Sequence, residues 1–271
     1  MKNLTLGFYL NDVMGREYFQ YLSPANQVSA RNLIQQMTDT PGSLAIPDSF
    51  APLAKLNANI LREFKDHSPV DWFDRFHKIY SYHLSVTHMD GNKVSQERVP
   101  DVNEYIEQRC HYAGVYHVLL LIEYSAGQFV DFQALKALNI DQRILRLHQV
   151  AASFSATAND LFSFEKEVID LDSDCNLVPI ILLNERELSL KDALLRACAI
   201  VRTYLLEILS LKDSIQLSLQ NILPGNPKLY FALNEHITGI IRCIQAGWMW
   251  HCYSHRYKRP HSIWIETTTG E

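Results

Sequence analysis

Residues 159–167 read Asn-Asp-Leu-Phe-Ser-Phe-Glu-Lys-Glu and lie within a long segment that has the hydrophobic periodicity of an α-helix. Asn159, Ser163 and Glu167 are spaced four residues apart, so on an α-helix their side chains stay within about 80° of one another. They offer an amide oxygen, a hydroxyl and a carboxylate, the hard oxygen ligands that suit Mg²⁺ when it shares phosphate oxygens. Lys166 falls on the same face and could contact a diphosphate oxygen. The segment therefore predicts a helix that carries a metal and diphosphate site.

A polar stripe on a solvated helix is the simpler interpretation of an Asn/Ser/Glu set at this spacing. Three large apolar neighbours argue against it, because Leu161, Phe162 and Phe164 leave little of the helix free to face water. We therefore favour the metal site over the solvated stripe.

The rest of the chain also has the pattern of α-helices. Apolar residues at spacings of three and four fill long segments, and ten glycines and ten prolines separate them. Only 177–183 resembles a strand, and Pro179 weakens that prediction. We expect one all-α domain over residues 1–271, with helices over 4–22, 27–37, 50–64, 70–86, 101–124, 141–171, 190–219 and 226–253.

Composition excludes several classes of protein. A net charge of −5 argues against a dedicated nucleic-acid binder, which usually carries a basic excess in a patch. Five scattered cysteines without a CxxC pair make a disulfide framework or a zinc cluster unlikely and favour a reducing compartment. Because no run of eighteen apolar residues occurs, we expect no membrane-spanning helix and a cytoplasmic protein.

The nine-residue string at 159–167 resembles the second metal-binding motif of class I terpene synthases, (N/D)D-x-x-(S/T)-x-x-x-E. Upstream, residues 8–17 read Phe-Tyr-Leu-Asn-Asp-Val-Met-Gly-Arg-Glu and resemble the aspartate-rich motif of the same family in its variant with a longer gap. In that comparison Asp12 is the first metal ligand and Glu17 the distal acid. Val13 stands in place of the second aspartate of the common form.

Two further segments resemble the family in the expected order. Residues 104–114 are similar to its diphosphate-sensing segment E-Y-x-x-x-R-(R)-x-x-x-G, which makes Arg109 the sensor and places a helix break with a substrate-facing carbonyl at Gly114. Cys110 takes the place of the second arginine that many bacterial members carry. Near the C terminus, Arg256 and Tyr257 resemble the family's Arg-Tyr pair, and Trp250 resembles a tryptophan often found just before it.

The resemblance to bacterial class I terpene synthases implies a single-domain α-helical bundle that ionises and cyclises a linear isoprenyl diphosphate, a sesqui- or diterpene precursor, and releases diphosphate. It implies three Mg²⁺ ions, held by Asp12, Glu17, Asn159, Ser163 and Glu167. Diphosphate contacts would come from Arg109, Lys166, Arg256 and Tyr257, and aromatic lining of the carbocation pocket first from Phe8 and Trp250. Besides the small-molecule substrate, the one macromolecular partner we consider is a second copy of the chain in a homodimer.

The resemblance leaves alternatives open. Family members have several helices before the aspartate-rich helix, which here begins almost at Met1, so we expect the usual N-terminal helices to be lacking. That start, together with Val13, favours a non-catalytic helical protein derived from a synthase.

A trans-prenyltransferase shares the fold but would carry a second DDxxD at 159–167. His251 and His255 have a zinc-compatible spacing, although hydrogen-bonded or solvated helix histidines are the better interpretation.

Overall fold

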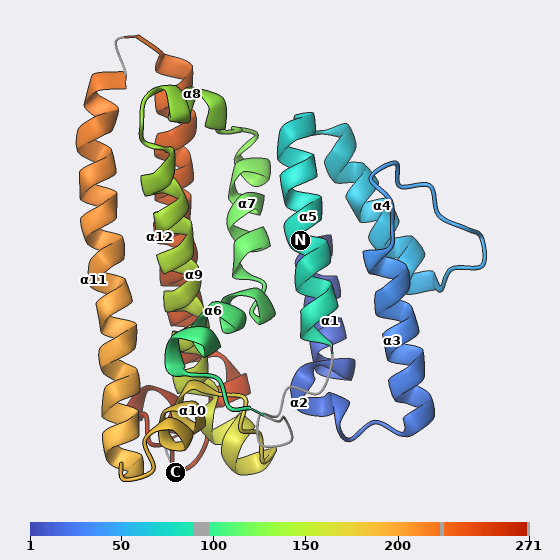
Figure 1. Ribbon diagram of the computed structural model, residues 1–271, viewed down its shortest axis with the longest axis vertical. Helices are drawn as coiled ribbons and strands as arrows, with labels where there is room; N and C mark the ends of the chain where they lie inside the picture. Colours follow the sequence, from blue (N-terminus) through green and yellow to red (C-terminus); the bar gives the residue numbers. More distant parts are fainter. Residues whose placement is uncertain (89–97, 223–224, 270–271) are drawn as a thin grey trace.

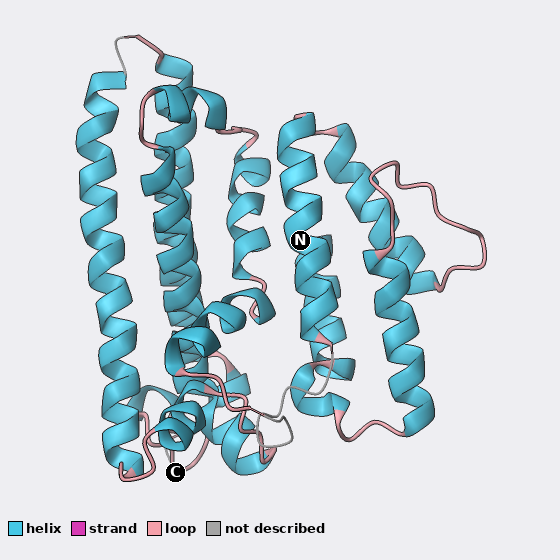
Figure 2. Ribbon diagram, in the orientation of Figure 1, coloured by secondary structure: helices cyan, strands magenta, loops and turns pink. Residues whose placement is uncertain are grey.

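Hydrophobic periodicity translates into helices along the whole computed structural model, which describes residues 1–88, 98–222 and 225–269 (Figure 1). Over these ranges Figure 2 shows helices and connecting loops without a strand. The helices are α1 Lys2–Met14, α2 Arg16–Phe19, α3 Pro24–Thr38, α4 Pro52–Asp66, α5 Val70–Thr87, α6 Val102–Tyr112, α7 Val115–Ala126, α8 Phe132–Ala137, α9 Asp141–Phe164, α10 Leu177–Asn184, α11 Leu190–Ile222 and α12 Pro227–Tyr253, with the π-helical turn η1 Glu165–Asp170 and the 3₁₀ turns η2 His255–Tyr257 and η3 Ile265–Thr267.

Residues 177–183, the segment that most resembled a strand, form α10, in agreement with the all-α prediction. Asn176 caps the helix by accepting a hydrogen bond from the backbone N–H of Val178. Pro179 then falls in the first turn, where a backbone N–H has no helical partner and its absence is tolerated. Pro179 is therefore a proline of the first helical turn, a position that helices tolerate.

Three of the long predicted helices are interrupted. The helix expected over 4–22 divides at Gly15 into α1 and α2, and a Cβ at Gly15 would lie 2.4 Å from the carbonyl oxygen of Asn11. The helix over 101–124 divides at Ala113 and Gly114, the break that the resemblance implied. The helix over 141–171 changes to π-helical geometry after Phe164. The short α8, capped by Asp131, was not predicted.

Two hydrophobic clusters hold the bundle together. The larger one joins α6 and α9 to α10, α11 and α12, and it includes Ile144, Leu147 and Val150 of α9. The smaller one joins α1, α3, α4 and α5, and Leu120 of α7 reaches into it. In Figure 1 the corresponding groups of helices lie on the left and right of the view, with α7 between them. As a result α9 is enclosed by its neighbours, and polar residues on it must find partners inside the protein.

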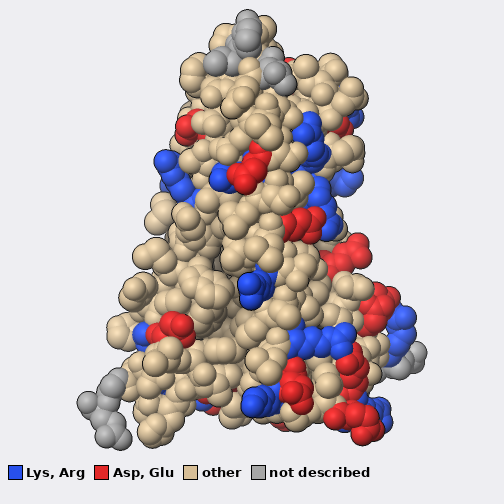
Figure 3. Space-filling view, turned by 90° about the vertical axis from the view of Figure 1, so that its left-hand side faces the viewer, with Lys and Arg blue, Asp and Glu red and all other residues tan. Residues whose placement is uncertain are grey.

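Charge is mixed on the one face of the molecule that Figure 3 shows. On the face that carries α11, Figure 3 shows Lys and Arg side chains interspersed with Asp and Glu. Within the described residues, none of the helices is both long and apolar enough to cross a bilayer.

Candidate metal and diphosphate site

The polar motif on α9 points into the protein. Asp160 is fully buried, Ser163 and Glu167 are 1% and 6% exposed, and Asn159 is half-buried. A solvated polar stripe is therefore excluded. Burial of this many polar groups requires internal partners, because an unpaired buried polar group costs about 1–3 kcal/mol.

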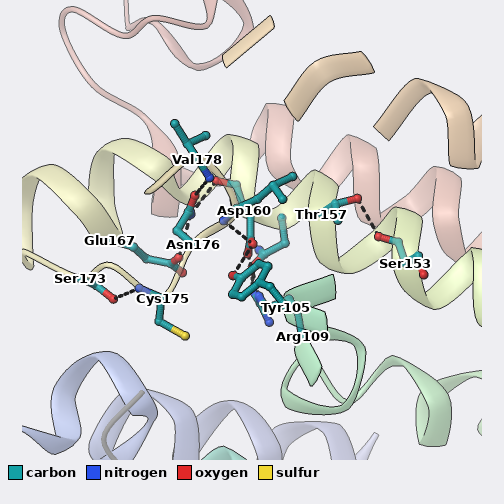
Figure 4. Close-up of polar contacts among 12 residues, drawn as sticks. Tyr105, Arg109, Ser153, Thr157, Asp160, Glu167, Ser173, Cys175, Asn176 and Val178 are labelled. Atoms are coloured by element: carbon teal, nitrogen blue, oxygen red, sulfur yellow. Dashed lines mark hydrogen bonds and ion pairs between the residues drawn. The ribbon is translucent and has the colours of Figure 1, made fainter. Parts of the chain in front are cut away.

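Asp160 is the best-satisfied member of the motif (Figure 4). Its Oδ1 accepts a hydrogen bond from Nε of Arg109 at 2.7 Å, and its Oδ2 accepts from the hydroxyl of Tyr105 at 2.6 Å and from the backbone N–H of Leu177 at 2.9 Å. Tyr105 and Arg109 belong to α6 and Leu177 begins α10, so one carboxylate ties three helices together. This role of Asp160 was not predicted from the sequence. The i, i+4 spacing of Tyr105 and Arg109, which places both side chains on one face of α6, could have indicated a shared partner.

Asn159 joins three of the predicted site segments. Its Oδ1 accepts a hydrogen bond from Nη2 of Arg109 at 2.8 Å, and its Nδ2 donates to the Tyr257 hydroxyl at 3.0 Å. Nδ2 also lies 3.2 Å from Nε2 of His251 on α12. Burial, with the charge of Arg109 as a smaller cause, lowers the pKa of His251 to about 4, so its ring is neutral and can accept this hydrogen bond. His251 is thus a hydrogen-bonded helix histidine.

Glu167 lies in the π-helical turn rather than on the α-helix. The i→i+5 bonding of η1 widens the turn, so the angle of about 80° derived from α-helical spacing does not apply to Glu167. Its Oε2 accepts a hydrogen bond from Nδ2 of Asn176 at 3.3 Å. Isolated π-helical turns inside α-helices often mark functional sites.

The C-terminal segment packs back against the end of the motif helix. Glu165 accepts hydrogen bonds from the Ser262 hydroxyl at 2.6 Å and from the backbone N–H of Ile263 at 3.2 Å. The indole Nε1 of Trp264 donates to the carbonyl oxygen of Leu161 at 2.8 Å, and Arg259 pairs with Asp170. These contacts hold Tyr257 beside Asn159.

Ser163 differs from the other polar residues of the motif in the state of its hydroxyl. Its Oγ is buried and has no hydrogen-bond partner among the described residues. Such an atom calls for a specific explanation, and a bound cation supplies one. The donor set of an amide oxygen, a hydroxyl and a carboxylate has the chemistry of a Mg²⁺ site, so these residues fit the ion that the family motif implies.

The second group of predicted site residues, which we call the second wall of the site, centres on Asp12 of α1 and lies beside the C-terminal segment. Oδ1 of Asp12 on α1 accepts a hydrogen bond from Nη1 of Arg256 at 2.9 Å. Lys166 extends toward the same side, with its Nζ 5.6 Å from the ring centre of Tyr18 on α2. The side chain of Glu17 lies outside the described residues.

The remaining predicted residues lie at the helix break and on the surface. Gly114 has φ +69°, and a Cβ there would lie 2.7 Å from Cε1 of His117 and 2.9 Å from Cε1 of His83, so glycine is required on both counts. Phe8 and Trp250 bring α1 and α12 together, with ring centres 6.4 Å apart. Both are more than half exposed.

Comparison with known proteins decides the family. Residues 2–206 match the family model described as terpene synthase family 2, C-terminal metal binding. The chain belongs to terpene synthase family 2. Its sequence is 26% identical over 207 residues to Terpene synthase 2 of Physarum polycephalum, a match that covers 75% of this chain and 56% of that relative. The chain therefore spans little more than half the length of this curated family member.

Solved structures show the same fold. The germacradien-4-ol synthase of Streptomyces citricolor superposes with a TM-score of 0.70 at 18% identity, over 92% of this chain and 76% of that one. The linalool/nerolidol synthase of Streptomyces clavuligerus, in complex with 2-fluorogeranyl diphosphate, gives 0.72 at 16% identity, over 92% and 80%. The predicted all-α class I terpenoid synthase bundle is thereby confirmed for this family 2 chain.

Proposed function

We propose that this chain is a Mg²⁺-dependent terpene cyclase that ionises and cyclises a linear isoprenyl diphosphate of sesqui- or diterpene precursor size. The observation that carries the proposal is the meeting of Asn159, Arg109 and Tyr257 through hydrogen bonds of 2.8 and 3.0 Å. These residues come from three segments that separately resemble the family's metal motif, sensor segment and Arg-Tyr pair. A metal ligand, a cation and a hydroxyl at one point form a suitable receptor for a metal-bound diphosphate.

The metal would be held on two walls. Asn159, Ser163 and Glu167 would supply oxygens from the motif helix, and Asp12, with Glu17, would supply them from the segment opposite. The partnerless Oγ of Ser163 supports this assignment. With Mg²⁺ bound, the site supplies Lewis-acid neutralisation of the leaving diphosphate, so that C–O ionisation needs no protein acid.

The chain's own cations would bind the same leaving group. Arg256 pairs with Asp12 and directly precedes Tyr257, which contacts Asn159, so its guanidinium lies between the two sets of proposed metal ligands. Lys166 and the Tyr257 hydroxyl add donors from the motif helix and the C-terminal segment. Arg109, held by Asp160, orients Asn159 and brings a positive charge to the site. Charge-assisted hydrogen bonds to phosphate oxygens are about twice as strong as neutral ones.

The cation that remains after ionisation needs an apolar, aromatic surrounding. Phe8 and Trp250 would supply ring faces, worth on the order of 0.5–2 kcal/mol per contact with a cation. Exclusion of water from the cation would prevent its early conversion to an alcohol. The fold neighbour that was solved with 2-fluorogeranyl diphosphate supports a substrate of this class.

Turnover with geranyl, farnesyl and geranylgeranyl diphosphate tests the proposal. In the presence of Mg²⁺ the chain should release diphosphate and form a hydrocarbon or a terpene alcohol from at least one of them. Asn159→Ala should lower the rate of diphosphate release by about 100-fold or more, because it removes a ligand from the centre that stabilises the leaving group.

Asn103→Ala is the matched control, since Asn103 is an exposed asparagine at the start of α6, and it should behave like the wild type. Absence of diphosphate release on all three substrates would contradict the proposal and favour a non-catalytic helical protein. Elongated isoprenyl diphosphates as products would favour the prenyltransferase alternative.

A further inference from the structure

A buried polar chain crosses four helices at some distance from the metal motif. Nε2 of His148 on α9 lies 2.6 Å from Nε2 of His236 on α12. Nδ1 of His236 lies 3.8 Å from Oε1 of Glu123 on α7. The other carboxylate oxygen of Glu123 accepts a hydrogen bond from the backbone N–H of Val130 at 2.9 Å and lies 3.7 Å from Arg75 of α5. None of these residues lies in the segments that resemble the family motifs.

The side chains of Glu123 and His236 are fully buried, and the two facing atoms, Oε1 and Nδ1, have no hydrogen-bond partner in the described part of the chain. A gap of 3.8 Å is just longer than a hydrogen bond, so a small rotation of either side chain closes it. Two unpaired buried groups of complementary chemistry favour that closure. The three side chains can therefore form one continuous hydrogen-bonded chain.

The outer end of this chain faces the same side of α9 as the metal motif. His148 and Asn159 are eleven residues apart, which places them within about 20° of each other and about 16 Å apart along the helix. Both turn toward α12, where His148 meets His236 and Asn159 meets His251. Between them this face carries small side chains, Ala152 and Ser155.

His148 also keeps accessible surface on this face of α9. The residue is half-buried, as are Ser155 and Asn159, whereas Ala152 between them is buried. Its Nδ1 makes no hydrogen bond within the described residues and is not fully enclosed. A substrate whose diphosphate is bound at Asn159 and whose hydrocarbon lies along α9 would bring its far part to this nitrogen.

We propose that His148 is the base that removes the terminating proton from the cyclised carbocation, and that His236 and Glu123 are positioning residues that pass this proton into the protein. The proposal rests on the proposed cyclase function and adds to it the group that ends the reaction. A C–H bond next to the cationic carbon breaks, its electron pair forms the C=C bond of the product, and the proton binds Nδ1 of His148. His148 then gives its Nε2 proton to His236, and His236 gives its Nδ1 proton to Glu123.

The chain explains how a weakly basic histidine could serve as the acceptor. Burial lowers the pKa of His148 to about 4 and that of His236 well below its usual value, so each ring stays neutral and carries a single proton. Burial raises the pKa of Glu123 to about 7, and the charge of Asp71 raises it slightly more. The hydrogen bond from Val130 and the charge of Arg75 act in the opposite direction but are weaker than burial. The carboxylate is therefore the group at which the proton comes to rest.

The positions of the protons predict two tautomeric states. With Glu123 ionised, His236 carries its proton on Nδ1 and His148 carries its proton on Nε2, which leaves the accessible Nδ1 of His148 free to accept. With Glu123 protonated, both rings switch, and Nδ1 of His148 carries the proton. The acceptor should therefore be available above about pH 7 and blocked below it.

Product analysis of Glu123→Gln tests the proposal. With farnesyl diphosphate and Mg²⁺, the variant should still release diphosphate, because ionisation takes place at the other end of the site. Its hydrocarbon-to-alcohol ratio should fall about 10-fold or more, since the cation persists until water captures it. In the wild type this ratio should rise with pH through about 7, and in Glu123→Gln it should be independent of pH.

Glu235→Gln is the matched control, because Glu235 is an exposed glutamate that directly precedes His236 on α12. It should retain the wild-type ratio and its pH dependence. If Glu123→Gln retains both as well, the relay is overturned while the cyclase function stands. Absence of diphosphate release from the wild type would instead overturn the cyclase function, and the catalytic role of the relay with it.

Histidine ¹⁵N NMR of the full chain provides a readout that does not need turnover. The wild type should show His148 protonated on Nε2 at pH 8 and on Nδ1 at pH 6, without a change in ring charge, and Glu123→Gln should show no such switch. A His148 tautomer that stays the same over this range would overturn the relay. A switch that also persists in Glu123→Gln would overturn it too.

Discussion

Replacement of Asp160 by alanine is expected to lower the free energy of unfolding by about 3–5 kcal/mol, the cost of removing one partner from a buried ion pair. Asp160 is fully buried, and the side chain of its partner Arg109 is 5% exposed. Without the carboxylate, the guanidinium charge stays in the interior with only weaker partners. The hydroxyl of Tyr105 and the backbone N–H of Leu177 lose an acceptor at the same time.

Urea unfolding at pH 7.5 measures this loss as a lower midpoint at unchanged slope. Asp213→Ala provides the comparison, because Asp213 pairs with Lys212 on the surface and is 69% exposed. Its effect should stay within about 1 kcal/mol. Adding Arg109→Leu to Asp160→Ala should recover part of the loss by removing the stranded charge. A single variant as stable as the wild type would show that Asp160 does not hold α6, α9 and α10 together.

Acidification is expected to unfold the protein between pH 6.5 and pH 4. Burial lowers the pKa values of His83, His148 and His251 to about 4, and it lowers those of His117 and His236 well below their usual value. A folded-state pKa below the unfolded value means that the folded state takes up fewer protons, so stability is present above pH 6.5 and is lost as the pH falls toward 4. Each shift from 6.5 to about 4 corresponds to about 3 kcal/mol, so three of them together are comparable with the whole stability of a typical domain.

Glu123 acts in the opposite direction, because its raised pKa makes its contribution fall as the pH rises from 4.5 to about 7. One carboxyl cannot offset five histidines, so the acid loss should dominate. Urea midpoints measured from pH 8 to pH 4 give the slope. His148→Gln should make it shallower, whereas replacement of the exposed His261 by glutamine should leave it unchanged. A stability that is constant from pH 6.5 to pH 4 would contradict this account of the interior.

The sequence predicted those parts of the site that depend on local order. The string at 159–167 indicated a helix with a polar inward face, and the resemblance of residues 104–114 indicated a break at Gly114, because both features are set by residues close together in the chain. The resemblance also linked Asn159, Arg109 and Tyr257, which the structure joins by hydrogen bonds across 50 and 98 residues of sequence.

Features that depend on tertiary contacts could not be predicted from the sequence. Asp160 is the second residue of the motif, yet nothing within the motif shows that it binds Tyr105 and Arg109. The π-helical turn after Phe164 arises where Glu165 and Asp170 meet the C-terminal segment, about ninety residues away. The chain of Glu123, His236 and His148 likewise joins three helices that lie far apart in the sequence.

The central claim is that Asn159, Ser163 and Glu167 form a metal-dependent receptor for diphosphate. Isothermal titration of the chain with inorganic diphosphate, once with Mg²⁺ and once with a chelator, measures this without any turnover. We expect saturable binding only with Mg²⁺, and a markedly weaker affinity in Asn159→Ala and Ser163→Ala. Diphosphate binding of equal strength with Mg²⁺ and with chelator, or no binding under either condition, would contradict it.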